Sequence, residues 1–117
     1  MVVRLREPDR VDLVFGALAD PTRRDIVGRV LRSEASVSEL AEKYAMSFAA
    51  VQKHVAALER AGLVTKQRQG RQQLVRGHID TIRAAERLLE QYEEIWRDRI
   101  GRLEQLLAEP FETNESE

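Results

Sequence analysis

Residues 47–64 read SFAAVQKHVAALERAGLV, a stretch that begins with a serine and has a glycine near its end. Ser47 is a residue type that caps helix N-termini, and Gly62 is the type that most readily takes the left-handed conformation that closes a helix. Between them, apolar residues recur three or four positions apart, at Val51, Val55 and Leu58. This spacing predicts a helix over residues 47 to about 61 with one buried face and one polar face.

A shorter helix is expected just before this one. The sequence Ser36-Val-Ser-Glu39 reads as a capping box, in which Ser36 accepts from the Glu39 amide and the Glu39 carboxylate accepts from the Ser36 amide. The short helix continues toward Tyr44, and a brief turn at residues 45–46 follows. Two helices joined by a tight turn form a helix-turn-helix, whose second helix can enter the DNA major groove.

Two further helices are expected upstream. Asp9 can cap the first helix, and Asp20-Pro21 interrupts it and starts the second, because proline at the first helical position has no amide hydrogen to lose. Each of the two helices has an apolar face at helical spacing. These faces are Val11, Val14, Phe15 and Leu18 in the first helix, and Ile26, Val27, Val30 and Leu31 in the second.

Strand-like character begins after Gly62, where β-branched residues become frequent. Residues 63–67 and 72–75 flank Arg68-Gln-Gly-Arg71, a glycine-centred turn with a basic residue on each side. We interpret this segment as a two-stranded hairpin, the wing of a winged helix-turn-helix.

One long amphipathic helix is predicted over residues 80 to about 109, because apolar residues recur every three or four positions and no proline intervenes before Pro110. The expected fold is therefore mainly α with a small β-hairpin wing, in the order α-α-α-α-β-β-α. We expect a winged helix-turn-helix domain with N- and C-terminal dimerisation helices over residues 1–109. An acidic disordered tail is expected over residues 110–117.

The charge of the chain is unevenly distributed. The formal net charge is only −1, but residues 41–78 carry seven basic against two acidic groups, a net of about +5. Residues 79–117 carry five basic against eleven acidic groups, a net of about −6. Local charge sets the field that a phosphate backbone meets, so the middle of the chain is suited to DNA.

The predicted DNA contacts lie on the second short helix and on the wing. Glutamine can make bidentate hydrogen bonds to adenine, and small alanine side chains allow close approach to a thymine methyl. Cations on a wing gain affinity by displacing the counterions condensed around phosphates. Each of these side chains could also belong to an ordinary solvated surface. The candidates are Ser47, Ala49, Ala50, Gln52 and Lys53 on the helix, and Lys66, Arg68, Gln69, Gly70 and Arg71 on the wing.

The apolar stripe of the last helix is longer than a 117-residue monomer covers well, which favours a homodimer, although part of it folds onto its own domain. A small apolar effector near Phe15, Tyr92 and Trp96 is a further hypothesis. The candidate dimer residues are Val11, Val14, Phe15, Leu18, Leu89, Tyr92, Trp96, Ile100, Leu103 and Leu107.

Three other polar residues have expected roles. His54 lies near the buried edge of the second short helix, which favours a structural histidine over a DNA contact. Arg23 and Arg24 open a helix at the end where the helix dipole disfavours cations. We expect them to pair with nearby acids such as Asp20, and contact with flanking phosphates stays open.

The order and spacing of these motifs resemble the ArsR/SmtB-type winged-helix regulators, from about Val14 to Leu107. The motifs that carry the resemblance are FGALADPTRR at 15–24, SELA at 38–41, VQKHV at 51–55, LERAGLV at 58–64 and Gly70-Arg71. The resemblance implies an elongated homodimer built on the first and last helices. It also implies two reading helices on a near-palindromic operator and repression by blocking a promoter.

The chain departs from that family at the positions that bind metal ions in its metal-sensing members. Metal-sensing members have two cysteines where this chain has Ser36 and Ser38, and neutral hydroxyls cannot replace thiolates for soft metals. A second kind of metal site in this family needs histidine and carboxylate pairs in the last helix. The only histidines of this chain, His54 and His78, both precede that helix. We therefore expect a metal-independent regulator without a cofactor, in the branch that lacks the metal motifs.

Other function classes are disfavoured by composition. The absence of cysteine excludes a disulfide framework and a thiolate nucleophile. The sequence also contains no motif with a nucleophile–base pair and no phosphate-binding glycine loop, so we do not expect an enzyme. No apolar run approaches the roughly 18 residues of a membrane span, and the N-terminus lacks the apolar core of a secretory signal, so we expect a cytoplasmic protein. Two alternatives stay open: a protein–protein interaction module and a non-specific DNA-binding protein on the same scaffold.

Overall fold

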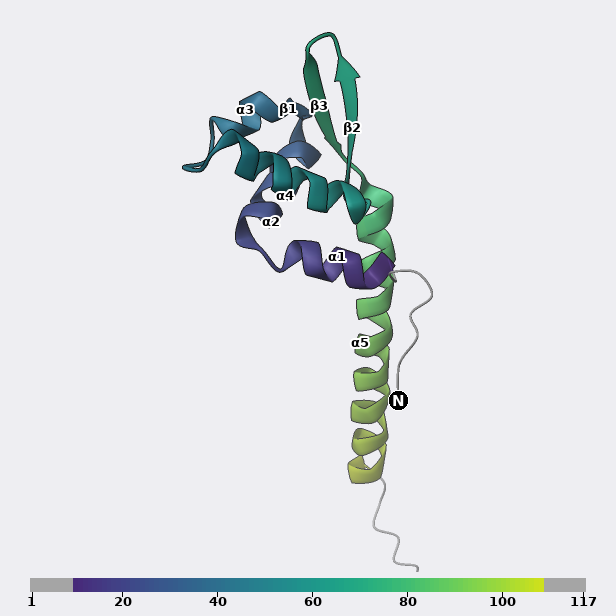
Figure 1. Cartoon of the computed structure of the whole chain (residues 1–117). Coiled ribbons are helices and arrows are strands. Elements are labelled where there is room, and N and C mark those ends of the chain that lie inside the picture. The colour runs from purple at the N-terminus through teal and green to yellow at the C-terminus, as the bar shows by residue number, and fades with distance from the viewer. Residues whose placement is uncertain (1–9, 109–117) are drawn as a thin grey trace, which may run out of the picture. The chain divides into compact units, whose positions relative to one another are not determined.

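The computed structural model describes residues 10–108, and its elements confirm the expected mainly α fold with a hairpin wing (Figure 1). The chain forms two compact units, one ending at Ala85 and one starting at Glu86. In chain order the elements are α1 (Arg10–Leu18), α2 (Pro21–Arg32), β1 (Ala35–Ser36), α3 (Val37–Ala41), α4 (Phe48–Arg60), β2 (Val64–Gln69), β3 (Gln72–Gly77) and α5 (Ile79–Ala108). The expected cap Asp9 and the expected tail, residues 110–117, lie outside the described residues.

Three of the predicted helix starts are confirmed by their caps. Asp20 accepts a hydrogen bond from the Arg23 amide at 3.0 Å, and Pro21 opens α2. Ser36 and Glu39 form the reciprocal capping box, with distances of 3.0 and 2.8 Å. Ser47 accepts from the amide of Ala50 at 3.1 Å, so α4 begins where its sequence predicts.

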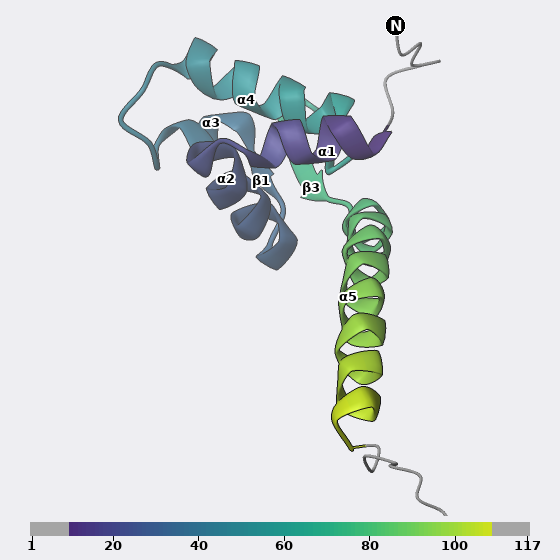
Figure 2. The same cartoon turned by 90° about the horizontal axis from the view of Figure 1, so that it is seen from below.

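The core of the first unit lies between the helices and the root of the wing. The predicted inner face of α4 is fully buried, and Ile26 of α2 and Val75 of β3 are buried with it. Figure 2 shows α1 beside α4, and α1 contacts both α2 and α4. The buried apolar residues are Val14, Ala17, Ile26, Val27, Val30, Val37, Leu40, Val51, Val55, Leu58, Ala61, Leu63, Val64, Val75 and Ala85.

The wing belongs to a three-stranded antiparallel sheet with the order β1-β3-β2. In the β2–β3 ladder Gln69 lies opposite Gln72, which leaves Gly70 and Arg71 as a two-residue turn, shorter than the four residues expected. Gly70 has a φ of +64°, the left-handed conformation that such a loop requires at its first position. The hairpin prediction is confirmed, although β2 starts one residue later than expected and both strands extend two residues further, to Gln69 and Gly77.

The sequence did not predict β1. It contains only Ala35 and Ser36, too few residues for an alternating pattern, and it exists because these residues pair with Val75 and Leu74 of β3. An ion pair between Glu34 and Arg76 lies beside this short ladder. The root of the wing is therefore tied to the segment that starts α3.

At two glycines of this unit, other parts of the chain lie close to the backbone. Gly62 has a φ of +79°, as expected for a residue that closes a helix, and its carbonyl accepts from the Thr81 hydroxyl at 2.6 Å. Gly77 lies against Leu31, so that a Cβ there would be 2.6 Å from Leu31 Cδ2 and 3.2 Å from Leu31 Cα. At both positions the packing leaves little room for a side chain.

The second unit contains the rest of α5, a continuous helix to Ala108 as the apolar repeat predicts. Seven of its large apolar side chains are 45–84% exposed in the single chain, whereas Leu88 and Ile100 are half-buried. The exposed ones are Leu89, Tyr92, Ile95, Trp96, Leu103, Leu106 and Leu107. Within residues 10–108, no helix is both long and apolar enough to cross a lipid bilayer.

Candidate nucleic-acid interface

The outward face of α4 carries the predicted reading residues. Ala49, Gln52 and Lys53 are exposed, Ala50 is half-buried, and the opposite side of the helix is fully buried against the core. Ser47, at the N-cap, is also exposed. Because the inner face is fixed by the core, the N-terminal half of α4 presents these side chains to solvent in a fixed orientation.

The tip of the wing carries the predicted basic residues. Arg68, Gln69, Gly70 and Arg71 are all exposed, and Arg68 Nε donates to the Gly70 carbonyl at 3.4 Å. This weak contact leaves most of the Arg68 donors available.

Lys66 differs from the other predicted wing cations. Its side chain is only 26% exposed, and its Nζ lies 3.6 Å from Glu59 Oε1 at the end of α4. Arg76, farther along the wing, is paired with Glu34. In the structure these two cations connect the wing to α4 and to the residue before β1, because the fold brings Glu59 and Glu34 beside them.

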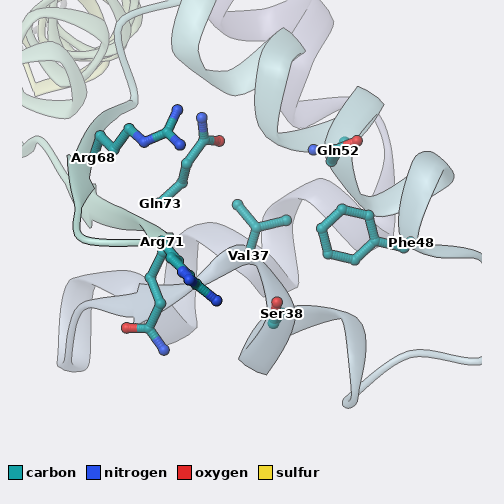
Figure 3. Close-up of a pocket in the computed structure, with 8 residues that line it drawn as sticks. Val37, Ser38, Phe48, Gln52, Arg68, Arg71 and Gln73 are labelled. Carbon is teal, nitrogen blue, oxygen red and sulfur yellow. The ribbon is translucent and has the colours of Figure 1, made fainter.

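A hollow of about 220 Å³ lies between α3, the first turns of α4 and the wing (Figure 3). It brings together three of the predicted residues, Gln52 from α4 and Arg68 and Arg71 from the wing. The predicted Ala49, Ala50, Lys53 and Gln69 do not line it. The full lining is Val37, Ser38, Phe48, Gln52, Arg68, Arg71, Gln72 and Gln73.

Five residues of this lining were missed by the sequence analysis: Val37, Ser38, Phe48, Gln72 and Gln73. For Phe48 a signal existed, because residues 48 and 52 are four apart and share one side of a helix. For the glutamines none existed, since their position depends on the register of the hairpin. No acidic side chain is among the eight residues that line the hollow, so its polar groups are amides, a hydroxyl and two guanidinium groups.

Arg23 and Arg24 have a role that the sequence analysis did not predict. Arg23 Nε donates to the Ala17 carbonyl at 2.7 Å, and an Arg24 guanidinium nitrogen donates to the Leu18 carbonyl at the same distance. The last carbonyls of α1 lack helical partners and carry partial negative charge, which cations stabilise. Both arginines therefore cap α1, and the expected pairing with Asp20 is limited to the Arg23 backbone amide and a longer-range attraction.

His54 occupies the structural position that was expected. Its Nδ1 lies 3.5 Å from an Arg23 guanidinium nitrogen and 3.8 Å from Asp20 Oδ2. The hydrogen bond from the Arg23 amide, together with the charges of His54 and Arg23, lowers the pKa of Asp20. This cluster joins α4 to the start of α2, away from the hollow.

A second polar cluster holds the end of the α3 segment against α2. The Tyr44 hydroxyl donates to Asp25 Oδ2 at 2.5 Å, and Arg29 Nε donates to the same oxygen at 2.8 Å. The Arg29 guanidinium carbon also lies 5.7 Å from the centre of the Tyr44 ring. The hydrogen bonds from Tyr44 and Arg29 lower the pKa of Asp25, whereas burial and the bond to Asp25 raise the pKa of Tyr44.

The predicted dimer residues of α1 are placed differently from one another. Phe15 is exposed, and Val11 and Leu18 are half-buried. Val14 was predicted to contact the partner, but it is only 2% exposed within a single chain, so it has almost no surface for a partner to cover. On α5, Ile100 is half-buried and the other predicted residues are exposed.

Over residues 10–108, no group of three or more His, Asp or Glu side chains is arranged to hold a metal ion.

A helix-turn-helix followed by a basic antiparallel hairpin defines a winged helix-turn-helix domain. Residues 18–67 match the sequence profile of the family described as "Helix-turn-helix domain". The chain is 36% identical to an ArsR family transcriptional regulator of known structure, with a TM-score of 0.73, and the match covers 79% of this chain and 95% of that one.

Two further solved structures are similar. An ArsR-like transcriptional regulator from Rhodococcus sp. RHA1 is 31% identical, with a TM-score of 0.73 and coverage of 87% of this chain and 95% of that one. The homodimeric winged helix-turn-helix DNA-binding domain of a possible ArsR-family regulator from Mycobacterium bovis is 25% identical, with a TM-score of 0.60 and coverage of 80% and 92%. No curated protein sequence matches the chain. The chain belongs to the ArsR family of winged helix-turn-helix proteins and is a DNA-binding transcriptional regulator.

Proposed function

We propose that this regulator is a sequence-specific repressor that binds a near-palindromic operator as a homodimer. The observation that carries the proposal is the hollow between α4 and the wing (Figure 3), which Gln52, Arg68 and Arg71 line together. One side chain that can read a base edge and two cations that can contact phosphates thus face a common space.

In this proposal the first turns of α4 enter the major groove. Gln52 reads a base, Lys53 contacts a neighbouring base or phosphate, and Ala49 allows the helix to approach closely. The N-terminus of α4 also presents backbone amides and the Ser47 hydroxyl, both of which suit a phosphate. The half-buried Ala50 lies at the edge of this surface.

The wing follows the DNA backbone next to that groove. Arg68 and Arg71 make the main phosphate contacts, and Gln69 and Gly70 at the tip of the wing lie close to the same DNA strand. Lys66 contributes less than predicted from the sequence, because its side chain is only 26% exposed and its ammonium group lies 3.6 Å from the Glu59 carboxylate. This division assigns sequence preference to α4 and general affinity to the wing.

The homodimer is supported by the exposed apolar side chains of α5 and by the relative from Mycobacterium bovis, which is described as homodimeric. So many large apolar groups on one helix are costly to leave in water, and a second copy of the same helix can cover them. Phe15 on α1 is a further candidate contact. In a two-fold dimer the two α4 helices would meet DNA about one turn, roughly 34 Å, apart.

Repression would follow from occupancy of the promoter by the dimer. The binding of an apolar effector stays a prediction. The fluorescence of Trp96, the single tryptophan, tests it directly, because a ligand that binds beside this ring changes its emission, and a flat response across apolar candidates would count against it.

The test of the proposed function is fluorescence anisotropy of the full chain with DNA from its own promoter and with a scrambled duplex of the same composition, each at two salt concentrations. We expect tight, salt-dependent binding to the promoter and weaker binding to the scrambled duplex. Equal binding to both would indicate a non-specific DNA-binding protein. Binding to neither would favour a protein–protein interaction module.

A further inference from the structure

Phe48 is a large apolar side chain that the core does not use. It is the first residue of α4, and its side chain is 46% exposed. Its neighbours Tyr44 and Met46 pack against the core, whereas Phe48 is not among the residues that do so. A single exposed aromatic residue is not unusual, so exposure alone does not indicate a function for Phe48.

The position of Phe48 is next to the proposed reading residue. Phe48 and Gln52 are one helical turn apart on the same side of α4, and both line the hollow that the wing closes on its other side (Figure 3). A phenyl ring is thus held among two arginines and three glutamines, in the part of the chain with a net charge of about +5 (seven basic against two acidic groups in residues 41–78).

The chemistry of this arrangement favours a DNA base that has an apolar group. The cations select a polyanion over a second protein surface, and among the four bases only thymine presents a methyl group in the major groove. Gln52, one turn along, has the donor and acceptor that pair with adenine. One helical turn rises about 5.4 Å and one base step about 3.4 Å, so the two side chains would reach bases one or two steps apart.

We propose that Phe48 is a specificity-determining residue that reads a thymine methyl group in the operator, within one or two base pairs of the base contacted by Gln52. The inference rests on the proposed sequence-specific DNA binding and adds an apolar base contact to it. It predicts that the operator half-site contains a thymine whose methyl group, and not only its hydrogen-bonding edge, contributes to affinity.

The experiment replaces each thymine of the promoter half-site in turn with deoxyuridine, which removes the methyl group and keeps the base pair. Binding of the full chain is measured by anisotropy. We expect one position at which wild-type protein binds about fourfold more weakly, the change that corresponds to burying about one methyl group. Phe48→Ala should bind the thymine and deoxyuridine duplexes equally at that position.

Two variants make the outcome specific. Phe48→Leu keeps an apolar side chain and should retain part of the preference for thymine. Ile79→Ala removes another exposed apolar side chain of the same unit and should leave the preference unchanged. Circular dichroism melting of each variant confirms that it folds, which is expected because Phe48 lies outside the core.

The possible results separate this inference from the proposed function. If the promoter is preferred over the scrambled duplex but no deoxyuridine position weakens binding, or if Phe48→Ala keeps the wild-type preference, the role of Phe48 is wrong and the proposed function stands. If promoter and scrambled duplex bind equally, sequence-specific reading is wrong and the inference is overturned with it.

Discussion

Gln52 and Arg71 line the same hollow, but their side chains suit different parts of DNA. An amide can discriminate between bases, whereas a guanidinium on the wing tip meets phosphates that are the same in every sequence. We expect Gln52→Ala to weaken binding to the preferred operator by about 1–3 kcal/mol and to change the base preference at one position. Anisotropy with single-base operator variants measures both effects.

Arg71→Ala should instead weaken binding to all duplexes by similar factors and reduce the slope of log affinity against log salt by about one unit. Salt titrations on the promoter and on the scrambled duplex give this slope. Arg97→Ala is the matched control, because Arg97 is an exposed arginine of α5 that pairs with Glu93. If the Gln52 and Arg71 variants changed specificity and salt slope alike, the assignment of the two roles would be wrong.

Gly77 and Gly16 offer a test of packing at single residues. Gly77→Ala places a Cβ 3.2 Å from the Leu31 backbone and closer still to its side chain, so the wing root must shift. We expect it to lower the free energy of unfolding by about 1–3 kcal/mol. At Gly16, inside α1, an added Cβ would have no atom within 4 Å apart from its chain neighbours and the local helix backbone, so Gly16→Ala should stabilise by about 0.5–1 kcal/mol. Urea unfolding at one fixed protein concentration compares them, and equal effects would contradict the predicted packing.

Among the elements, the segment after α3 is fastened to α2 by Asp25, Arg29 and Tyr44. Because the folded-state pKa of Asp25 is lowered below its usual 3.8, this carboxylate stabilises the fold above that value, and the contribution is lost as the pH falls through the folded-state pKa. The stability difference between wild type and Asp25→Asn should therefore be full at neutral pH and decrease below about pH 4. Urea unfolding at several pH values measures it.

The contribution of Tyr44 can be separated from that of Asp25. Tyr44→Phe removes the hydrogen bond that contributes most to lowering the pKa of Asp25, so this pKa should rise toward its usual value. An NMR titration of the Asp25 carboxyl carbon in wild type and variant follows this change. An unchanged pKa would mean that Arg29 alone holds the carboxylate.

For the whole molecule, the proposed dimer makes DNA affinity depend on α5. Ile100→Glu places a charge in the apolar stripe and should shift the protein toward monomer, with a loss of operator affinity although no DNA contact changes. Gln105→Glu is the control, because by helical periodicity it lies about opposite the stripe and adds the same charge. Sedimentation gives the oligomeric state, and an intact dimer of Ile100→Glu would count against α5 as the dimer surface.

The sequence by itself determined the starts of α2, α3 and α4, the presence of a glycine turn at Gly70, the left-handed Gly62 and the inner face of α4. These features are local, because a cap or a turn depends on residues about three positions apart and an apolar stripe on the helical repeat. The sequence also placed Gln52, Arg68 and Arg71 on elements that the structure brings to one hollow.

Only the tertiary structure decided which polar side chains have partners within the chain. It brought Glu59 beside Lys66, Glu34 beside Arg76 and the α1 carbonyls beside Arg23, and it paired β1 with β3. It also buried Val14 and placed Phe48 on the hollow. Each of these outcomes depends on how separate elements pack, because an exposed face and a paired face can have the same local sequence pattern.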